Sequence, residues 1–275
     1  MIATHPPRGA AGHAKKGVTM KISTATVLYF SGTSTTEKYA KSFADALPYR
    51  TSLSNIPVGR RCYLRLDTDN LLVLAAPVYG GYIPPFIWDT LASVSGNSAP
   101  VVPLAVYGAR DYDNALLEMS GKLANKGFMT VGAAALVAQH SIVPSIAAGR
   151  PSDADLDSVA AFAATIGERL DGMASIADAP VFSFKGEMGT GAAPGIVPAV
   201  MEEYCIDCST CAWGCPACAI EESNPIWTDP ERCVSCMRCI VNCPSSARRV
   251  PEPVLAGASA MLTKVADPSK ANEFF

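Results

Sequence analysis

Short apolar runs alternate with amphipathic stretches over the first two thirds of the chain. Each apolar run is followed by residues with helical spacing, which is the pattern of a parallel sheet covered by helices on both faces. The clearest predicted strands are residues 24–30, 71–76, 101–107 and 131–138, and a weaker one lies within residues 50–66.

The predicted helices cover residues 35–46, 85–93, 112–126 and 153–174. The last of them is expected to begin at Ser152, a plausible N-cap after Pro151. The alternation amounts to five β–α units. It predicts an α/β fold with a doubly wound, five-stranded parallel sheet over residues 21–177.

A change of composition separates this region from the rest of the chain. Residues 178–200 are rich in Gly and Pro and lack periodicity, so we interpret them as a linker. Gly189 and Gly191 do not form a dinucleotide loop, because no strand precedes them and Pro194 stands where that fingerprint needs its third Gly. Residues 201–250 form a second, cysteine-rich domain, and residues 251–275 are expected to be a C-terminal helix and tail.

The cysteines reveal an internal repeat. Nine of the ten lie between Cys205 and Cys243, and a shift of 28 residues superimposes two runs of the form C-x2-C-x2-C-x3-C-P. Three cysteines with two residues between neighbours allow one tight loop to bind three corners of a cubane cluster through their thiolates. Zinc also accepts four thiolates, but zinc ribbons usually pair two C-x2-C hooks over longer loops, so iron–sulfur clusters are favoured.

Residues 201–250 resemble a bacterial-type ferredoxin, a small α+β domain with two [4Fe–4S] clusters. In such ferredoxins the fourth cysteine of each run ligates the other cluster. The resemblance therefore implies one cluster on Cys205, Cys208, Cys211 and Cys243, and a second on Cys233, Cys236, Cys239 and Cys215. Cys62 and Cys218 fit neither set and are expected to be buried, as free cysteines commonly are.

Polar loops follow three of the predicted strands, at the sheet edge where ligands of such folds collect. The first loop, residues 31–36, offers hydroxyls and backbone N–H groups at a helix N-terminus, which suits a phosphate. The same loop is also consistent with a simple N-cap. The other two loops contain Pro-Val-Tyr-Gly-Gly from residue 77 and Val-Tyr-Gly-Ala-Arg from residue 106.

Together with the Glu-Phe-Phe terminus, these loops resemble the ferredoxin-fused flavodoxins, in which a flavodoxin-like domain precedes a two-cluster ferredoxin. The resemblance implies that Ser31, Gly32, Thr33, Ser34, Thr35 and Thr36 hold the phosphate of FMN. It also implies that Tyr79, Gly80, Gly81, Tyr107 and Gly108 border its isoalloxazine ring. The family loop usually has Gly where this chain has Ser34, and serine is disfavoured there if the position needs a positive φ.

Charge and hydropathy narrow the range of partners. A net charge of -3 and a pI near 5.6 give no basic face for nucleic acid. No apolar run reaches the roughly 18–20 residues of a membrane-spanning helix, so no membrane insertion is expected.

Residues 1–20 lack the apolar core of a secretory signal and are predicted to be a disordered extension. Clustered cysteines indicate metal ligation in a reducing cytoplasm.

The sequence favours an electron-transfer flavoprotein that shuttles electrons between FMN and two clusters, with a redox protein or small redox molecule as partner. Two alternatives stay open. One is a flavin-dependent reductase of a small substrate fed by its own ferredoxin domain, although no acid or base can be assigned for it. The other is a ferredoxin with a flavin-free docking domain.

Overall fold

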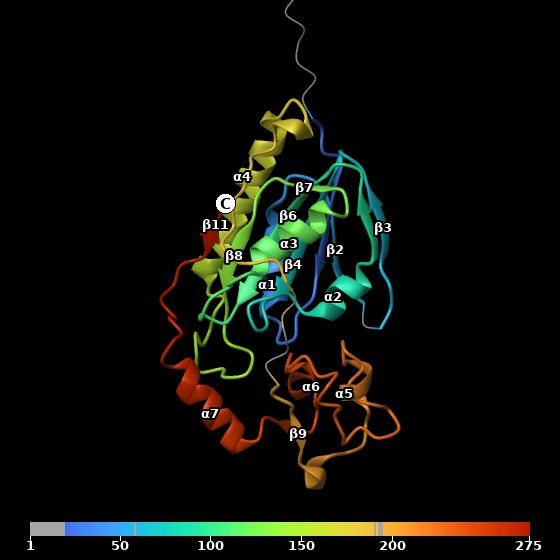
Figure 1. Ribbon diagram of the computed structural model, residues 1–275, viewed down its shortest axis with the longest axis vertical. Coiled ribbons are helices and arrows are strands. Elements are labelled where there is room, and N and C mark those ends of the chain that lie inside the picture. Colours follow the sequence, from blue (N-terminus) through green and yellow to red (C-terminus); the bar gives the residue numbers. More distant parts are fainter. Residues whose placement is uncertain (1–19, 58, 190, 192–194) are drawn as a thin grey trace, which may run out of the picture.

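The computed structural model describes residues 20–57, 59–189, 191 and 195–275, and all but the last residue of the extension expected over residues 1–20 lies outside them. A parallel sheet forms its centre (Figure 1). Its strands stand in the order β2-β1-β4-β6-β8, which is the 2-1-3-4-5 order of flavodoxin-like folds. Their bounds are β1 (Thr24–Tyr29), β2 (Arg50–Asn55), β4 (Asn70–Pro77), β6 (Ala99–Tyr107) and β8 (Ala134–Val137). The predicted doubly wound five-stranded fold is confirmed.

Helices cover both faces of this sheet, and each face has its own apolar core (Figure 1). On one face α1 (Thr35–Ala46) and α4 (Asp153–Gly172) bury side chains such as Phe43 and Ile166. On the other face lie α2 (Pro85–Thr90) and α3 (Ala115–Ala124). Ser152 caps α4 as predicted, since its hydroxyl accepts a hydrogen bond from the Asp155 N–H at 3.3 Å.

Three sequence predictions need correction. The strand expected over residues 131–138 is shorter, since β8 covers Ala134–Val137, and a separate strand that was not predicted, β7 (Phe128–Thr130), precedes it; both pair with β6. Gly132 lies between them, where a side chain would collide with Ile166 of α4. The weak strand within residues 50–66 is also two strands, β2 and β3 (Tyr63–Leu66). The helix expected over residues 85–93 ends at Thr90, and β5 (Ser93–Gly96) follows and pairs with β3.

The cysteine-rich part, called here the cysteine module (residues 199–250), has little regular structure. It contains β9 (Ala199–Val200), η2 (Glu202–Tyr204), α5 (Thr210–Trp213), α6 (Arg238–Val241) and β10 (Arg248–Arg249). Strands β9 and β10 pair antiparallel. The sequence repeat is also a backbone repeat, because Asp207 and Ser209 have positive φ, as do Ser235 and Met237 one repeat later. The two copies therefore fold alike.

Two segments tie the cysteine module to the flavodoxin-like domain (residues 20–177). The predicted linker follows η1 (Ile176–Asp178) and contacts the domain, with Lys185 in an ion pair with Asp111 at 2.7 Å. After the module, α7 (Glu252–Leu262) leads into a tail that returns to the sheet, where β11 (Glu273–Phe274) pairs antiparallel with β8 (Figure 1). Within the described part of the chain, every helix is too short or too polar to cross a membrane.

Candidate cofactor sites

The loop from β1 to α1 has the features of an anion site. Ser34 stands at the N-terminus of α1 with φ 64°, in the left-handed region, and its side chain makes no capping hydrogen bond. The buried Ser31 hydroxyl has no hydrogen-bond partner among the described residues. An uncapped helix N-terminus beside a buried hydroxyl without a partner fits a phosphate, which would accept hydrogen bonds from both.

A small pocket of about 80 Å³ joins this loop to the loops that follow β4, β6 and β8. Eight of the eleven residues predicted to bind the cofactor line it: Gly32, Thr33, Thr35, Thr36, Tyr79, Gly80, Tyr107 and Gly108. Three do not. The Ser31 hydroxyl is buried beside it, Ser34 is exposed at the start of α1, and Gly81 lies against Asp113.

His140, in the loop after β8, also lines the pocket and lies against Gly108. Its Nδ1 accepts hydrogen bonds from the N–H groups of Ile142 and Val143, both at 3.2 Å. Burial, with a smaller contribution from the Arg110 charge, lowers the pKa of His140 below its usual value. His140 therefore caps two backbone N–H groups of its own loop, and as a neutral ring it carries its proton on Nε2. The sequence could have indicated that His140 lies at this pocket, because His140 follows a strand and the pocket is formed by the loops after the strands.

The cysteines gather into two groups around two separate cavities. Cys205, Cys208, Cys211 and Cys243 line one cavity, and Cys215, Cys233, Cys236 and Cys239 line the other. Among the residues that the structure describes, no three His, Cys, Asp or Glu side chains converge closely enough to hold a single metal ion.

The two cysteine groups differ in their surroundings. Burial raises the pKa of Cys236 to about 12 and that of Cys239 to about 11. In the other group, hydrogen bonding with Thr210 lowers the pKa of the Cys208 thiol. Cys236 is buried, whereas all four cysteines of the other group are half-buried, so we call the group of Cys236 the enclosed group and the other the solvent-facing group. Cys218 is exposed and Cys62 half-buried, so the expected burial of Cys218 is wrong: the turn after Cys215 places it at the surface.

The enclosed cysteine group lies against the loop of residues 31–36, called here the anion-type loop. A side chain on Gly32 would collide with the backbone carbonyl of Cys236 and would touch the Tyr79 hydroxyl. The Arg238 guanidinium lies 5.7 Å from the centre of the Phe30 ring. Cys236 and Met237 belong to the same apolar core as α2 and α3. The fold therefore places the enclosed cysteines beside the anion site, a proximity that the sequence did not predict.

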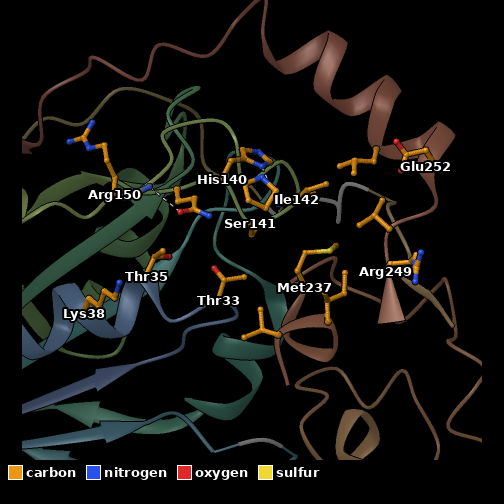
Figure 2. Close-up of a pocket in the computed structure, with 17 residues that line it drawn as sticks. Thr33, Thr35, Lys38, His140, Ser141, Ile142, Arg150, Met237, Arg249 and Glu252 are labelled. Atoms are coloured by element: carbon orange, nitrogen blue, oxygen red, sulfur yellow. Dashed lines mark hydrogen bonds between the residues drawn. The ribbon is translucent and has the colours of Figure 1, made fainter. Parts of the chain in front are cut away.

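A larger cavity of about 540 Å³ lies between the flavodoxin-like domain and the cysteine module (Figure 2). Polar residues of the flavodoxin-like domain line one side, including Thr33, Thr35 and His140. The opposite side consists of Met237, Ile240, Val241, Val250 and Leu255 of α6, β10 and α7, together with the charged Arg249 and Glu252.

The family described as 4Fe-4S binding domain matches residues 226–249. The cysteine module is an iron–sulfur domain. With the flavodoxin-like sheet before it, the chain has the architecture of a flavodoxin–ferredoxin fusion, as the sequence predicted.

Solved structures similar to the chain include a flavodoxin from Streptococcus pneumonia TIGR4. It is 14% identical, covers 54% of this chain and 99% of its own, and has a TM-score of 0.40. A flavodoxin from the domain Archaea is also 14% identical, covers 54% of this chain and 98% of its own, and has a TM-score of 0.39. No curated protein matches the chain.

Proposed function

We propose that this protein is a cytoplasmic electron-transfer flavoprotein that binds FMN and two [4Fe–4S] clusters and passes electrons between them. The observation that carries the proposal is the contact between Gly32 of the anion-type loop and Cys236 of the enclosed cysteine group. Two redox groups held on these two loops would be neighbours. Electron exchange within one chain would then need no movement of the two domains relative to each other.

The flavin phosphate would be held by the loop of residues 31–36. The Ser31 hydroxyl, which has no partner in the described part of the chain, and the N–H groups at the uncapped N-terminus of α1 would donate hydrogen bonds to it, and Thr36 is buried at the core side of the loop. Tyr79, Gly80, Tyr107 and Gly108 border the remainder of the cofactor. Burial raises the pKa of Tyr107 to about 12, so its hydroxyl stays protonated and can donate a hydrogen bond.

Each cluster would be held by the four cysteines that line one cavity. In this arrangement Cys215 and Cys243 each ligate the cluster of the other cysteine run. Bound flavin exchanges electrons in pairs or singly whereas each cluster takes one, so the combination links two-electron donors to one-electron acceptors. Cys236 of the enclosed group is buried, whereas Cys208 of the solvent-facing group is half-buried. The solvent-facing cluster is thus the one suited to a redox partner protein or small redox molecule.

The proposal is tested on the full chain, purified without oxygen and reconstituted with iron, sulfide and FMN. We expect about eight iron and eight acid-labile sulfide per chain, as two cubane clusters require. Flavin absorption bands are expected on top of the broad cluster absorption, with about one FMN per chain. Stoichiometric zinc, four iron, or clusters without any bound flavin would contradict it.

A further inference from the structure

One buried arginine of the cysteine module has no carboxylate partner. Arg248 in β10 is 3% exposed, and within the described part of the chain it forms no ion pair. Its guanidinium donates hydrogen bonds to the Thr228 hydroxyl at 2.8 Å and to the Pro225 carbonyl, while its Nε finds no partner among the described residues. A buried cation is costly unless negative charge lies close to it. The surroundings of Arg248 are therefore expected to supply that charge.

Arg248 lies between the two cysteine groups. Arg248 and Pro225 both line the solvent-facing cavity, whereas Thr228 lines the enclosed one. The charge of Arg248 also reaches the enclosed group. Burial raises the pKa of Cys239 to about 11, and the Arg248 charge acts against that rise. It acts in the same direction on Cys233, whose pKa burial also raises. One guanidinium thus adjoins both groups of four cysteines.

The equivalent position in the other copy of the cysteine repeat is apolar. A shift of 28 residues places Ile220 at the position of Arg248. Ile220 is also buried and lines the enclosed cavity. The same place in the repeat therefore holds an isoleucine next to one cavity and an arginine next to the other. Because an apolar side chain satisfies the packing there, the arginine points to a role for its charge.

We propose that Arg248 is a counter-charge shared by the two clusters, and that its guanidinium stabilises the reduced form of both. The inference rests on the proposed function and adds a residue that sets its reduction potentials. A cluster that accepts one electron from the flavin gains one negative charge, and a buried cation beside it offsets that charge. Burial opposes the same gain of charge. Arg248 compensates for that cost at both cavities.

The test uses the full chain, purified without oxygen and reconstituted with iron, sulfide and FMN. Arg248→Gln removes the charge but keeps an N–H donor for Thr228 or Pro225, whereas Arg248→Lys keeps the charge. We expect Arg248→Gln to lower the equilibrium constant for one-electron reduction of both clusters about tenfold, a shift of about 59 mV to more negative potential. Arg248→Lys is expected to shift both potentials much less. Redox titrations followed by electron paramagnetic resonance give the midpoint potentials.

Arg249→Gln is the matched control. It removes the same charge from the next residue, whose side chain is exposed, so solvent and salt screen its charge and both potentials are expected to stay near those of the wild type. If Arg248→Gln leaves both potentials unchanged, or if Arg248→Lys shifts them equally, the charge of Arg248 has no such role and the inference fails. A shift in Arg249→Gln as large as that in Arg248→Gln would also overturn it.

Iron content separates this role from a purely structural one. Loss of clusters in Arg248→Gln alone would support the counter-charge, because Arg248→Lys retains the charge and the clusters with it. Loss in both variants would show that Arg248 only anchors the loop of Pro225 and Thr228, and the inference would fail while the proposed function stands. If the wild type itself holds no clusters after reconstitution, the proposed function fails, and the inference fails with it.

Discussion

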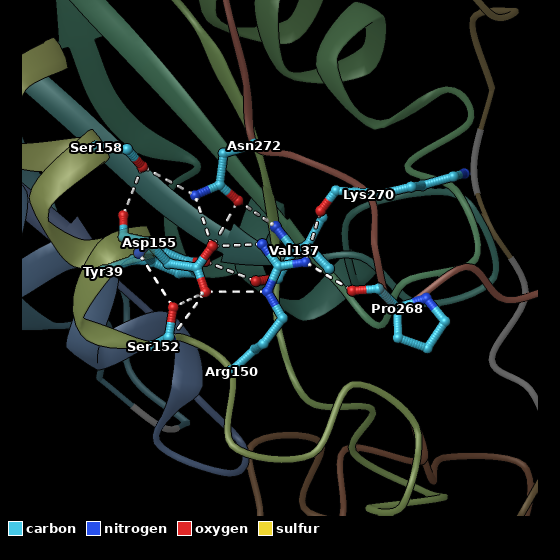
Figure 3. Close-up of polar contacts among 9 residues, drawn as sticks. All are labelled: Tyr39, Val137, Arg150, Ser152, Asp155, Ser158, Pro268, Lys270 and Asn272. Atoms are coloured by element: carbon cyan, nitrogen blue, oxygen red, sulfur yellow. Dashed lines mark hydrogen bonds and ion pairs between the residues drawn. The ribbon is translucent and has the colours of Figure 1, made fainter.

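The side-chain oxygen of Asn272 accepts a hydrogen bond from the backbone N–H of Val137 at 2.8 Å, across 135 positions of the chain (Figure 3). The Asn272 amide nitrogen donates to Asp155 and Ser158 of α4, at 3.4 and 3.2 Å. Nearby, Arg150 pairs with Asp155 and also donates to the backbone carbonyls of the tail. The tail after the cysteine module is thereby held on the flavodoxin-like domain.

Replacing Asn272 by alanine removes the hydrogen bonds of its side chain and leaves the Val137 N–H without its partner, whereas the contacts of Arg150 remain. Leaving such a group unsatisfied costs about 1–3 kcal/mol, so we expect a lower midpoint of thermal unfolding. Hydrogen exchange of residues 268–275 is expected to accelerate. Asn97→Ala, which removes an exposed hydrogen bond to Asp67, is the control and is expected to change little. Equal effects of the two substitutions would show that the tail is not anchored through Asn272.

Ser34→Gly relieves backbone strain at the start of α1. Ser34 has φ 64° and no capping hydrogen bond, and a left-handed conformation costs a non-glycine residue on the order of 1 kcal/mol. We expect a higher unfolding temperature and equal or tighter FMN binding by fluorescence titration. Ser152→Gly is the matched control with the opposite sign, because Ser152 caps α4 from an ordinary extended conformation. Destabilisation by Ser34→Gly would mean that the serine side chain makes a contact of its own with the ligand.

Cys215→Ser tests the exchange of ligands between the two runs. Cys215 shares its cavity with Cys233, Cys236 and Cys239, so the substitution is expected to damage the enclosed cluster and spare the solvent-facing one. Electron paramagnetic resonance of the reduced protein distinguishes the two clusters. Cys218→Ser is the control, since Cys218 lines neither cysteine cavity and both clusters are expected to remain. Selective loss of the solvent-facing cluster in Cys215→Ser would refute the exchange.

Trp213 lies on α5, two residues after Cys211 of the solvent-facing group, and is 64% exposed. An exposed tryptophan beside a redox centre is suited to contact with a partner protein. We expect Trp213→Ser to slow electron transfer to a protein acceptor such as cytochrome c, with little effect on ferricyanide, in stopped-flow reoxidation. Tyr63→Ser, an exposed aromatic of β3 at 76% exposure, is the control. Equal rates for all three proteins would exclude this face from docking.

Electron exchange between flavin and clusters is expected to be intramolecular. The contact between Gly32 and Cys236, with the linker and the tail both attached to the flavodoxin-like domain, keeps the two sites together at any protein concentration. Flash photoreduction of the flavin, followed as the clusters bleach, is expected to give one rate constant across a wide dilution series. A rate that rises with protein concentration would indicate transfer between molecules.

Much of the fold could be predicted from the sequence because its signals are local. The runs at β1, β4 and β6 are apolar on both faces, which is typical of central parallel strands. The short strand β7 and the later start of β8 at Ala134 were missed, and Gly132 between them lies close to Ile166, a residue distant in sequence. The exposure of Cys218 was also missed, since composition says nothing about which way a turn points a side chain.

The sequence by itself determined the alternation of strands and helices, the polar loops after the strands and the cysteine repeat, because each arises from residues close together in the chain. Only the tertiary structure decided that Cys236 lies against Gly32, that Asn272 reaches Val137, and that a cavity opens between the domains. These contacts join segments more than a hundred residues apart. They depend on how the two domains pack, and no local pattern of residues encodes that packing.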